Sequence, residues 1–255
     1  MKTSNTKTSN TKTSNMKTAC TKTACTKIHS EIKINNLKKE FDRFSLNIEN
    51  LSVPQGKIYG IIGANGCGKT TIMKIISGLI TPDSGLIDYA GLTPRDITMV
   101  FRKPYLMHDT VIKNLMYPLT LRKITPDNEK VEYYLKIAEL YDIKNEYAPA
   151  LSGGQQQKLA LIRAFIFSPR LIIIDEGFSN LDIESTGLFE QLILDRQKKE
   201  PVTYIICAHQ LSHIQRLCGH IFFMHNGMVE EEGSADEILL KPKSLKLQNY
   251  LRFAV

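Results

Sequence analysis

Along most of the chain, segments of alternating apolar and polar residues are followed by segments with apolar residues every three or four positions. Alternation over residues 30–54, ended by a Pro-Gln-Gly turn, predicts two half-buried strands. The apolar runs at 57–63, 171–175 and 202–208 are typical of buried parallel strands, and residues 70–80 have a helical period. This order predicts an α/β fold with a mainly parallel sheet and an antiparallel β subdomain at its N-terminal side.

The middle of the chain, about residues 104–165, carries mostly helical patterns and separates the two strand-forming halves. We expect an inserted α-helical subdomain there, with breaks at Pro118 and Thr125-Pro126, because proline removes a backbone donor. A further helix is expected at 184–199. Residues 222–233 contain Asn-Gly between strand-like runs, which predicts a hairpin.

The N-terminal residues 1–27 form a pentapeptide repeat with six lysines and no acid. They account for six of the seven net positive charges, which leaves +1 on the rest and argues against a nucleic-acid partner. The repeat has too little apolar surface to fold, so we expect a disordered tail: either a basic tether to phosphate-rich surfaces or an expanded repeat without a role. One folded domain is expected at 28–245, followed by a C-terminal tail at 246–255.

No apolar run approaches the ~18 residues of a membrane span, so the chain is not expected to cross a bilayer. The five cysteines are scattered and form no CxxC pair, which favours free thiols in a reducing cytoplasm over disulfides or zinc ligands. They are Cys20, Cys25, Cys67, Cys207 and Cys218.

A phosphate-binding loop is predicted at residues 63–70, GANGCGKT, which match G-x-x-x-x-G-K-[ST] between a strand and a helix. Its glycines let backbone N–H groups face a phosphate chain at a helix N-terminus. Lys69 is expected to reach the β and γ phosphates of ATP, and the Thr70 hydroxyl to bind Mg²⁺. The alternative is a glycine turn with a surface lysine. The expected nucleotide-binding residues are Gly63, Ala64, Asn65, Gly66, Cys67, Gly68, Lys69, Thr70 and Thr71.

Two further motifs follow in the chain. LSGGQ at 151–155 precedes a helix and offers Ser152 as an N-cap, although alone it fits any helix start. The run LIIIDE ends in Asp175 and Glu176, which places carboxylates at the strand edge where Mg²⁺ and the attacking water must be held. His209 follows a third strand and is expected at the same edge, where it either contacts the γ phosphate or is structural.

In this order, GANGCGKT, LSGGQ, LIIIDE and His209 resemble the ATP-binding cassette of ABC transporters over about residues 31–240. The resemblance implies a P-loop NTPase (RecA-like) core and a head-to-tail dimer that encloses two ATP molecules. It implies γ-phosphate contacts across that dimer from the LSGGQ motif, namely Ser152, Gly153, Gly154 and Gln155.

The resemblance also assigns roles to single residues. Glu176 and Lys69 would be catalytic, with Glu176 as the base, and His209 would be the switch histidine. Asp175 would lie beside Mg²⁺, and Asp182 would belong to the loop that couples the two sites. The position of Phe41 fits the adenine-stacking aromatic, although Phe44 competes.

Two positions depart from the family pattern. Gly177 stands where proline usually follows the catalytic glutamate, which is expected to loosen the turn. Arg102, in MVFRKPYL, stands where the family places a glutamine near Mg²⁺. Arginine has no acceptor and cannot ligate a cation. It either reaches phosphate oxygens or a carboxylate such as Glu176, slowing hydrolysis or tying it to partner docking, or it turns to solvent.

The favoured function is the ATPase subunit of a transporter whose membrane-spanning chains are separate. The alternatives are a soluble assembly ATPase and a weakly hydrolysing nucleotide-binding regulator. The segment after Arg102 resembles the corresponding segment in the cassette subunits of bacterial importers for small anions such as tungstate or molybdate. The implied partners are permease subunits, a second copy or a related cassette, and a substrate-binding protein, which would place the chain at the cytoplasmic membrane face.

Overall fold

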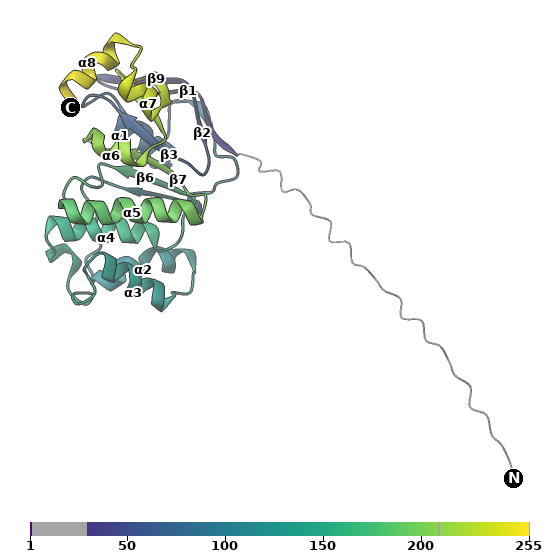
Figure 1. Cartoon of the computed structure of the whole chain (residues 1–255), viewed down its shortest axis with the longest axis vertical. Helices are drawn as coiled ribbons and strands as arrows, with labels where there is room; N and C mark the ends of the chain where they lie inside the picture. Colours follow the sequence, from purple (N-terminus) through teal and green to yellow (C-terminus); the bar gives the residue numbers. More distant parts are fainter. Residues whose placement is uncertain (2–29, 209, 255) are drawn as a thin grey trace.

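The computed structural model describes Met1, residues 30–208 and residues 210–254 (Figure 1). The expectations for the repeat, apart from Met1, and for His209 therefore fall on residues outside the described part. Strands of the described part form a three-stranded antiparallel sheet, ordered β2-β1-β4, and a six-stranded sheet, ordered β5-β6-β7-β3-β8-β9. The strands are β1 (Glu31–Phe41), β2 (Phe44–Pro54), β3 (Ile58–Ile62), β4 (Ser84–Asp88), β5 (Ile97–Val100), β6 (Leu171–Asp175), β7 (Thr203–Cys207), β8 (His220–His225) and β9 (Met228–Ser234).

The larger sheet is parallel except for its last strand, since β9 pairs antiparallel with β8. The α/β class, the mainly parallel sheet and the added antiparallel sheet are thereby confirmed. Helices connect and cover the strands. They are α1 (Lys69–Ile76), α2 (Val111–Arg122), α3 (Asn128–Ile137), α4 (Gly153–Phe165), α5 (Ile183–Lys199), α6 (Leu211–Leu217), α7 (Ala235–Leu240) and α8 (Leu245–Ala254).

Both faces of the central strands are buried, each in its own hydrophobic core. In β6, Leu171 and Ile173 belong to a core formed with α1 and the three-stranded sheet. Ile172 and Ile174 point the other way, into the core formed with the helices that follow. Side chains alternate between the faces of a strand, so a run of apolar residues is needed where both faces are covered.

Helices α2, α3 and α4 lie between β5 and β6 in the chain and stack beyond α5 in Figure 1. The expected break at Pro118 is wrong, because α2 continues through it. Proline lacks the N–H that the Asn114 carbonyl would accept. Leu115 and Leu119, on either side of Pro118 in α2, are nevertheless buried. The free energy gained by burying these two side chains outweighs the loss of one backbone hydrogen bond. The chain does break at Thr125-Pro126, between α2 and α3.

Residues 246–255, expected as a C-terminal tail, are instead largely helix α8. Leu247 is fully buried, and Tyr250 and Leu251 pack against the core. The Tyr250 ring lies 5.5 Å from the ring of Phe223 in β8. A spacing of three to four residues places these side chains on one helix face, so the segment docks. Among the described residues, none of the helices has the length and apolar character needed to span a membrane.

Candidate nucleotide-binding and hydrolysis site

The candidate site lies at the carboxyl ends of β6, β7 and β3, which are neighbours in the central sheet. The carboxyl ends of parallel strands meet at one edge, where ligands of α/β proteins bind. The phosphate loop leaves β3 here, and Asp175 and Glu176 leave β6. The sheet order therefore brings together residues that are more than 100 positions apart in the chain.

The glycines of the loop have backbone conformations that side chains would disturb. Gly63, Gly66 and Gly68 have φ values of 147°, 78° and 109°. A Cβ at Gly63 would lie 2.3 Å from the Met224 carbonyl oxygen, and one at Gly68 would lie 2.9 Å from Phe44. At Gly66 a Cβ would meet nothing within 4 Å. The loop is thus packed against the protein at two glycines and open at the third, which suits a cradle for phosphate.

The loop ends in α1, whose N-cap Gly68 provides no side-chain hydrogen bond. The first N–H groups of a helix have no partner within the helix, and they favour an anion. The Lys69 ammonium donates to the carbonyl oxygens of Gly63 at 2.7 Å and Ala64 at 2.9 Å. The Lys69 side chain is therefore folded back onto the phosphate loop.

Thr70 and Asp175 lie in contact across the site. The Thr70 hydroxyl donates to Oδ2 of Asp175 at 2.8 Å. Burial raises the pKa of the Asp175 carboxyl, and the Thr70 hydrogen bond offsets part of this effect. Hydroxyl and carboxylate oxygens are hard ligands of the kind that Mg²⁺ prefers. The donor set and the glycine cradle beside it fit MgATP.

Glu176 adopts a left-handed backbone conformation, with φ of 53°, directly after β6. Its N–H donates to the Cys207 carbonyl at 2.8 Å, which attaches it to β7. Its side chain forms an ion pair with Arg102, whose Nε lies 3.1 Å from Oε2. Backbone conformations of this kind are costly and cluster at functional sites. Of the open alternatives for Arg102, the structure contains the contact with Glu176.

Gly177 follows in a restricted position. A Cβ there would lie 2.5 Å from Cγ2 of Ile174. The expectation that glycine loosens this turn stays a prediction. The structure shows that the backbone at Gly177 lies so close to Ile174 in β6 that a side chain would not fit.

The LSGGQ segment begins α4, with Ser152 as the N-cap. Ser152 Oγ accepts from the N–H of Gln155 at 3.3 Å, and the Gln155 side chain accepts from the N–H of Ser152 at 3.0 Å. A Cβ at Gly153 would meet nothing within 4 Å, whereas one at Gly154 would lie 3.1 Å from the Asn180 carbonyl oxygen. The motif thus lies against the loop after β6, with its N-cap exposed.

The remaining predicted residues lie at the borders of the site. Phe41 ends β1, is exposed, and its ring lies 6.2 Å from that of Phe44. Phe44 is the aromatic nearer the phosphate loop, since it approaches Gly68. Asp182 caps α5 and accepts from the N–H and hydroxyl of Ser185 at 2.7 and 2.9 Å. The Ser185 N–H lowers the pKa of Asp182.

The thiol of Cys67 lies just before α1, in the phosphate loop, and its pKa is raised. Burial raises its pKa, and the neighbouring Lys69 lowers it by less. The side chain is only 5% exposed, which explains why desolvation of the thiolate outweighs the favourable charge.

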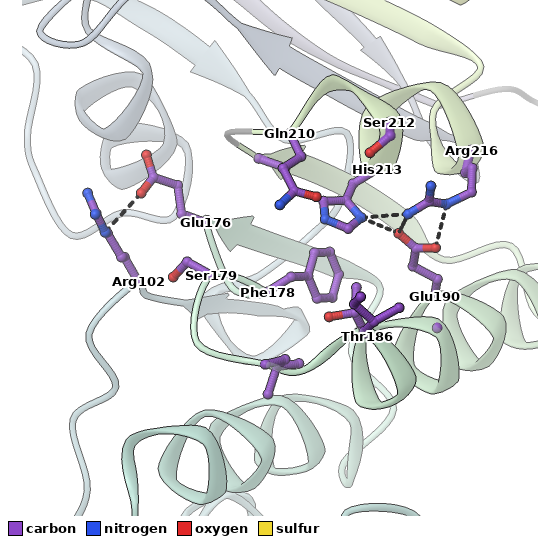
Figure 2. Close-up of a pocket in the computed structure, with 14 residues that line it drawn as sticks. Arg102, Glu176, Phe178, Ser179, Thr186, Glu190, Gln210, Ser212, His213 and Arg216 are labelled. Atoms are coloured by element: carbon purple, nitrogen blue, oxygen red, sulfur yellow. Dashed lines mark hydrogen bonds and ion pairs between the residues drawn. The ribbon is translucent and has the colours of Figure 1, made fainter. Parts of the chain in front are cut away.

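Sequence reasoning missed a polar cluster beside the site. It borders a cavity of about 740 Å³ that Arg102 and Glu176 also line (Figure 2). Glu190 on α5 accepts two hydrogen bonds from Arg216 on α6, at 2.8 and 2.9 Å, and lies 2.6 Å from Nδ1 of His213. His213 and Arg216 lie three residues apart on one face of α6, and Glu190 lies opposite them on α5. The sequence could not reveal this cluster, because it depends on how the two helices pack. The cluster ties α6 to the helix that Asp182 caps.

Two side chains of α4 were also missed. Gln157, fully buried, donates to the carbonyl of Phe101 at 3.3 Å. Arg163 donates to the carbonyl of Tyr105 at 2.7 Å. Both hold the loop that carries Arg102, and their partners are backbone atoms, which a sequence does not specify.

Comparison with known proteins gives the family. The family described as ABC transporter matches residues 46–179. The tungstate uptake system ATP-binding protein TupC of Peptoclostridium acidaminophilum is 37% identical over 209 residues, which cover 79% of this chain and 97% of that protein. The methionine import ATP-binding protein MetN of Histophilus somni is 33% identical over 240 residues, 86% of this chain and 70% of that protein. The chain therefore belongs to the ABC transporter family, as one of its ATP-binding subunits that hydrolyse ATP.

Proposed function

We propose that this ATPase works at the cytoplasmic face of a membrane, bound to separate permease chains that import a small oxyanion of the tungstate class. The observation that carries the substrate class is the similarity to TupC, which extends over 97% of that protein. Methionine is the competing substrate, because MetN proteins are also similar to the chain.

The nucleotide is bound by the phosphate loop and Lys69, with the adenine on Phe41. Lys69 already lies over the loop carbonyls at 2.7 and 2.9 Å, so a short movement of its ammonium reaches a phosphate. Thr70 and Asp175 hold Mg²⁺, directly or through water. The ion, when bound, neutralises charge on the phosphate oxygens.

Glu176 acts as the general base that accepts a proton from the attacking water. A base needs an oxygen within hydrogen-bond reach of that water, and the end of β6 presents the carboxylate at the strand edge beside Asp175. His209 contacts the γ phosphate from the end of β7. The roles of Glu176 and His209 are inferred from the sequence motifs of the family. The position of Glu176 directly after β6 supports its role as the base.

The second copy supplies Ser152, Gly153, Gly154 and Gln155 to the γ phosphate. This proposal is supported by the exposure of Ser152 and by the open backbone at Gly153. The start of a 13-residue helix favours an anion there. Asp182 then couples the two sites, because it caps α5 at the end of the loop that Gly154 approaches.

The permease is expected to dock on the helical segment between β5 and β6. Tyr105 is 79% exposed and Tyr147 is 48% exposed on this segment. The ring of Tyr147 packs edge-on against His108, 6.2 Å between centroids. Exposed aromatic groups of this kind favour a protein interface. A substrate-binding protein would complete the importer on the other side of the membrane.

Purification of the tagged full chain from native membranes tests the proposal. The complex that co-purifies would be reconstituted in lipid vesicles, and its ATPase rate measured with substrate-binding protein plus tungstate, molybdate or L-methionine. Tungstate is expected to raise the rate several-fold and L-methionine to leave it unchanged. Absence of a membrane-spanning partner, or stimulation by L-methionine alone, would contradict the proposal.

A further inference from the structure

Arg102 and Glu176 form an ion pair in which the two side chains differ strongly in exposure. Arg102 is 65% exposed and Glu176 is 11% exposed, with Nε and Oε2 3.1 Å apart. Figure 2 shows the Glu176 carboxylate directed toward Arg102 and away from the cluster of Glu190, His213 and Arg216. An exposed arginine is therefore in contact with a nearly buried carboxylate.

This contact opposes the action of Glu176 as a base. An arginine offers five N–H donors and no acceptor, so it competes with a water proton for the carboxylate oxygens. While the pair is intact, one oxygen of Glu176 is occupied and its negative charge is compensated. The Glu176 oxygen that Arg102 engages is therefore not presented to the attacking water.

The loop that carries Arg102 is held by α4 at both ends. Gln157 donates to the carbonyl of Phe101, just before Arg102, and Arg163 donates to the carbonyl of Tyr105, just after it. Arg102 follows β5 and Glu176 follows the neighbouring strand β6, whose Ile174 pairs with Val100 of β5. The ion pair therefore joins the ends of two neighbouring strands. Helix α4 acts on it through Gln157 and Arg163, so a displacement of α4 would move the loop that carries Arg102 relative to Glu176.

We infer that Arg102 is a positioning residue that restrains Glu176 and keeps turnover low until a partner docked on the helical segment moves α4. This inference rests on the proposed role of Glu176 as the base. It adds a regulatory contact at a position where the family usually has glutamine. The contact links nucleotide hydrolysis to the same segment that presents Tyr105 to the permease.

The test is the MgATPase turnover of the purified full chain in four forms: wild type, Arg102→Gln, Arg102→Lys and Lys103→Gln. Lys103→Gln is the matched control, because it removes the adjacent exposed charge. Arg102→Gln is expected to raise kcat about fivefold with KM unchanged, the factor that ~1 kcal/mol of a partly exposed ion pair gives. Arg102→Lys, which retains a cation, is expected to stay within about twofold of wild type.

An Arg102→Gln rate equal to that of Lys103→Gln, or below it, overturns the inference. Glu176→Gln separates this failure from failure of the proposed role. If Glu176→Gln abolishes turnover while Arg102→Gln has no effect, the base assignment stands and the restraint alone is wrong. If Glu176→Gln retains turnover, both are wrong.

Discussion

The hydroxyl of Thr70 donates to Oδ2 of Asp175 at 2.8 Å and joins the first turn of α1 to the end of β6. In the chain the two residues are separated by β4, β5 and the helices α2, α3 and α4. Their contact closes one side of the phosphate site with two oxygen donors. It also leaves a buried carboxyl whose pKa is raised, which links catalytic function to a cost in stability.

Asp175→Asn is expected to separate these two effects. The amide still accepts from Thr70 but carries no buried charge, so the nucleotide-free protein should be as stable as wild type or more stable by ~1 kcal/mol. Mg²⁺-dependent ATP hydrolysis should fall at least about 100-fold, because a metal ligand is lost. Urea unfolding measures the stability of the nucleotide-free protein, and Mg²⁺ titration of the ATPase measures the loss of hydrolysis. A large loss of stability would contradict this reading of Asp175.

The glycines of the phosphate loop predict graded costs for alanine. Gly63→Ala should reduce the free energy of unfolding by ~3 kcal/mol or more, because its Cβ would lie 2.3 Å from a backbone oxygen. Gly66→Ala should cost only ~1 kcal/mol, the strain of its left-handed backbone in open space. Gly187→Ala, inside α5 and without a close neighbour, should stabilise by ~0.5–1 kcal/mol. Equal losses in the free energy of unfolding for Gly63→Ala and Gly66→Ala would contradict the close packing at Gly63 and the open space at Gly66.

The cluster of Glu190, His213 and Arg216 predicts a pH dependence of stability. Burial would raise the pKa of Glu190, but hydrogen bonds from Arg216 and His213 outweigh it and lower the pKa below the ordinary 4.5. A carboxyl with a lowered folded-state pKa adds stability above its unfolded pKa, and this stability is lost as pH falls through the folded pKa. Glu190→Gln should cost ~1 kcal/mol at pH 7 and progressively less as the pH falls below 4.5.

Unfolding curves of wild type and Glu190→Gln at pH 7 to 3.5 measure this difference. Glu184 is an exposed acid on the same helix, and Glu184→Gln is the control. Its free energy of unfolding should change with pH in parallel with that of wild type. A Glu190→Gln curve that stays parallel to wild type over the whole range would show that the cluster contributes no pH-dependent stability.

Cys67 should react slowly with thiol reagents. Burial raises its pKa, so the thiolate fraction at neutral pH is below that of a free cysteine. Alkylation by iodoacetamide, followed by mass spectrometry of the Cys67 peptide, should be slow at pH 7.5, faster at higher pH, and slower still with MgATP present. Modification should inhibit the ATPase. Rapid labelling at pH 7.5 that nucleotide does not change would contradict this.

The sequence allowed good prediction where one residue type is needed for one geometry. Continuous apolar residues in 171–175 predicted a strand covered on both faces, and the phosphate loop and Asp175 lie at the sheet edge as expected. The loop glycines have positive φ values, which only glycine adopts without strain.

The failures arose where tertiary contacts decided the outcome. Pro118 was expected to end a helix, but burial of Leu115 and Leu119 holds α2 together around it. Residues 245–254 form α8 because Leu247 is fully buried in the core. The sequence left the partner of Arg102 open among several alternatives. Choosing among them requires the backbone path of the loop at residues 101–105, which Gln157 and Arg163 hold through its carbonyl groups.

We propose that two copies of the chain enclose ATP between the phosphate loop of one and Ser152 of the other. Light scattering of Glu176→Gln measures this most directly, because the variant should bind MgATP without hydrolysing it. We expect twice the mass of the 28.9 kDa chain with MgATP, and the monomer mass with MgADP or after the further change Ser152→Arg. A variant that binds MgATP and remains a monomer, or a dimer that Ser152→Arg leaves intact, would contradict it.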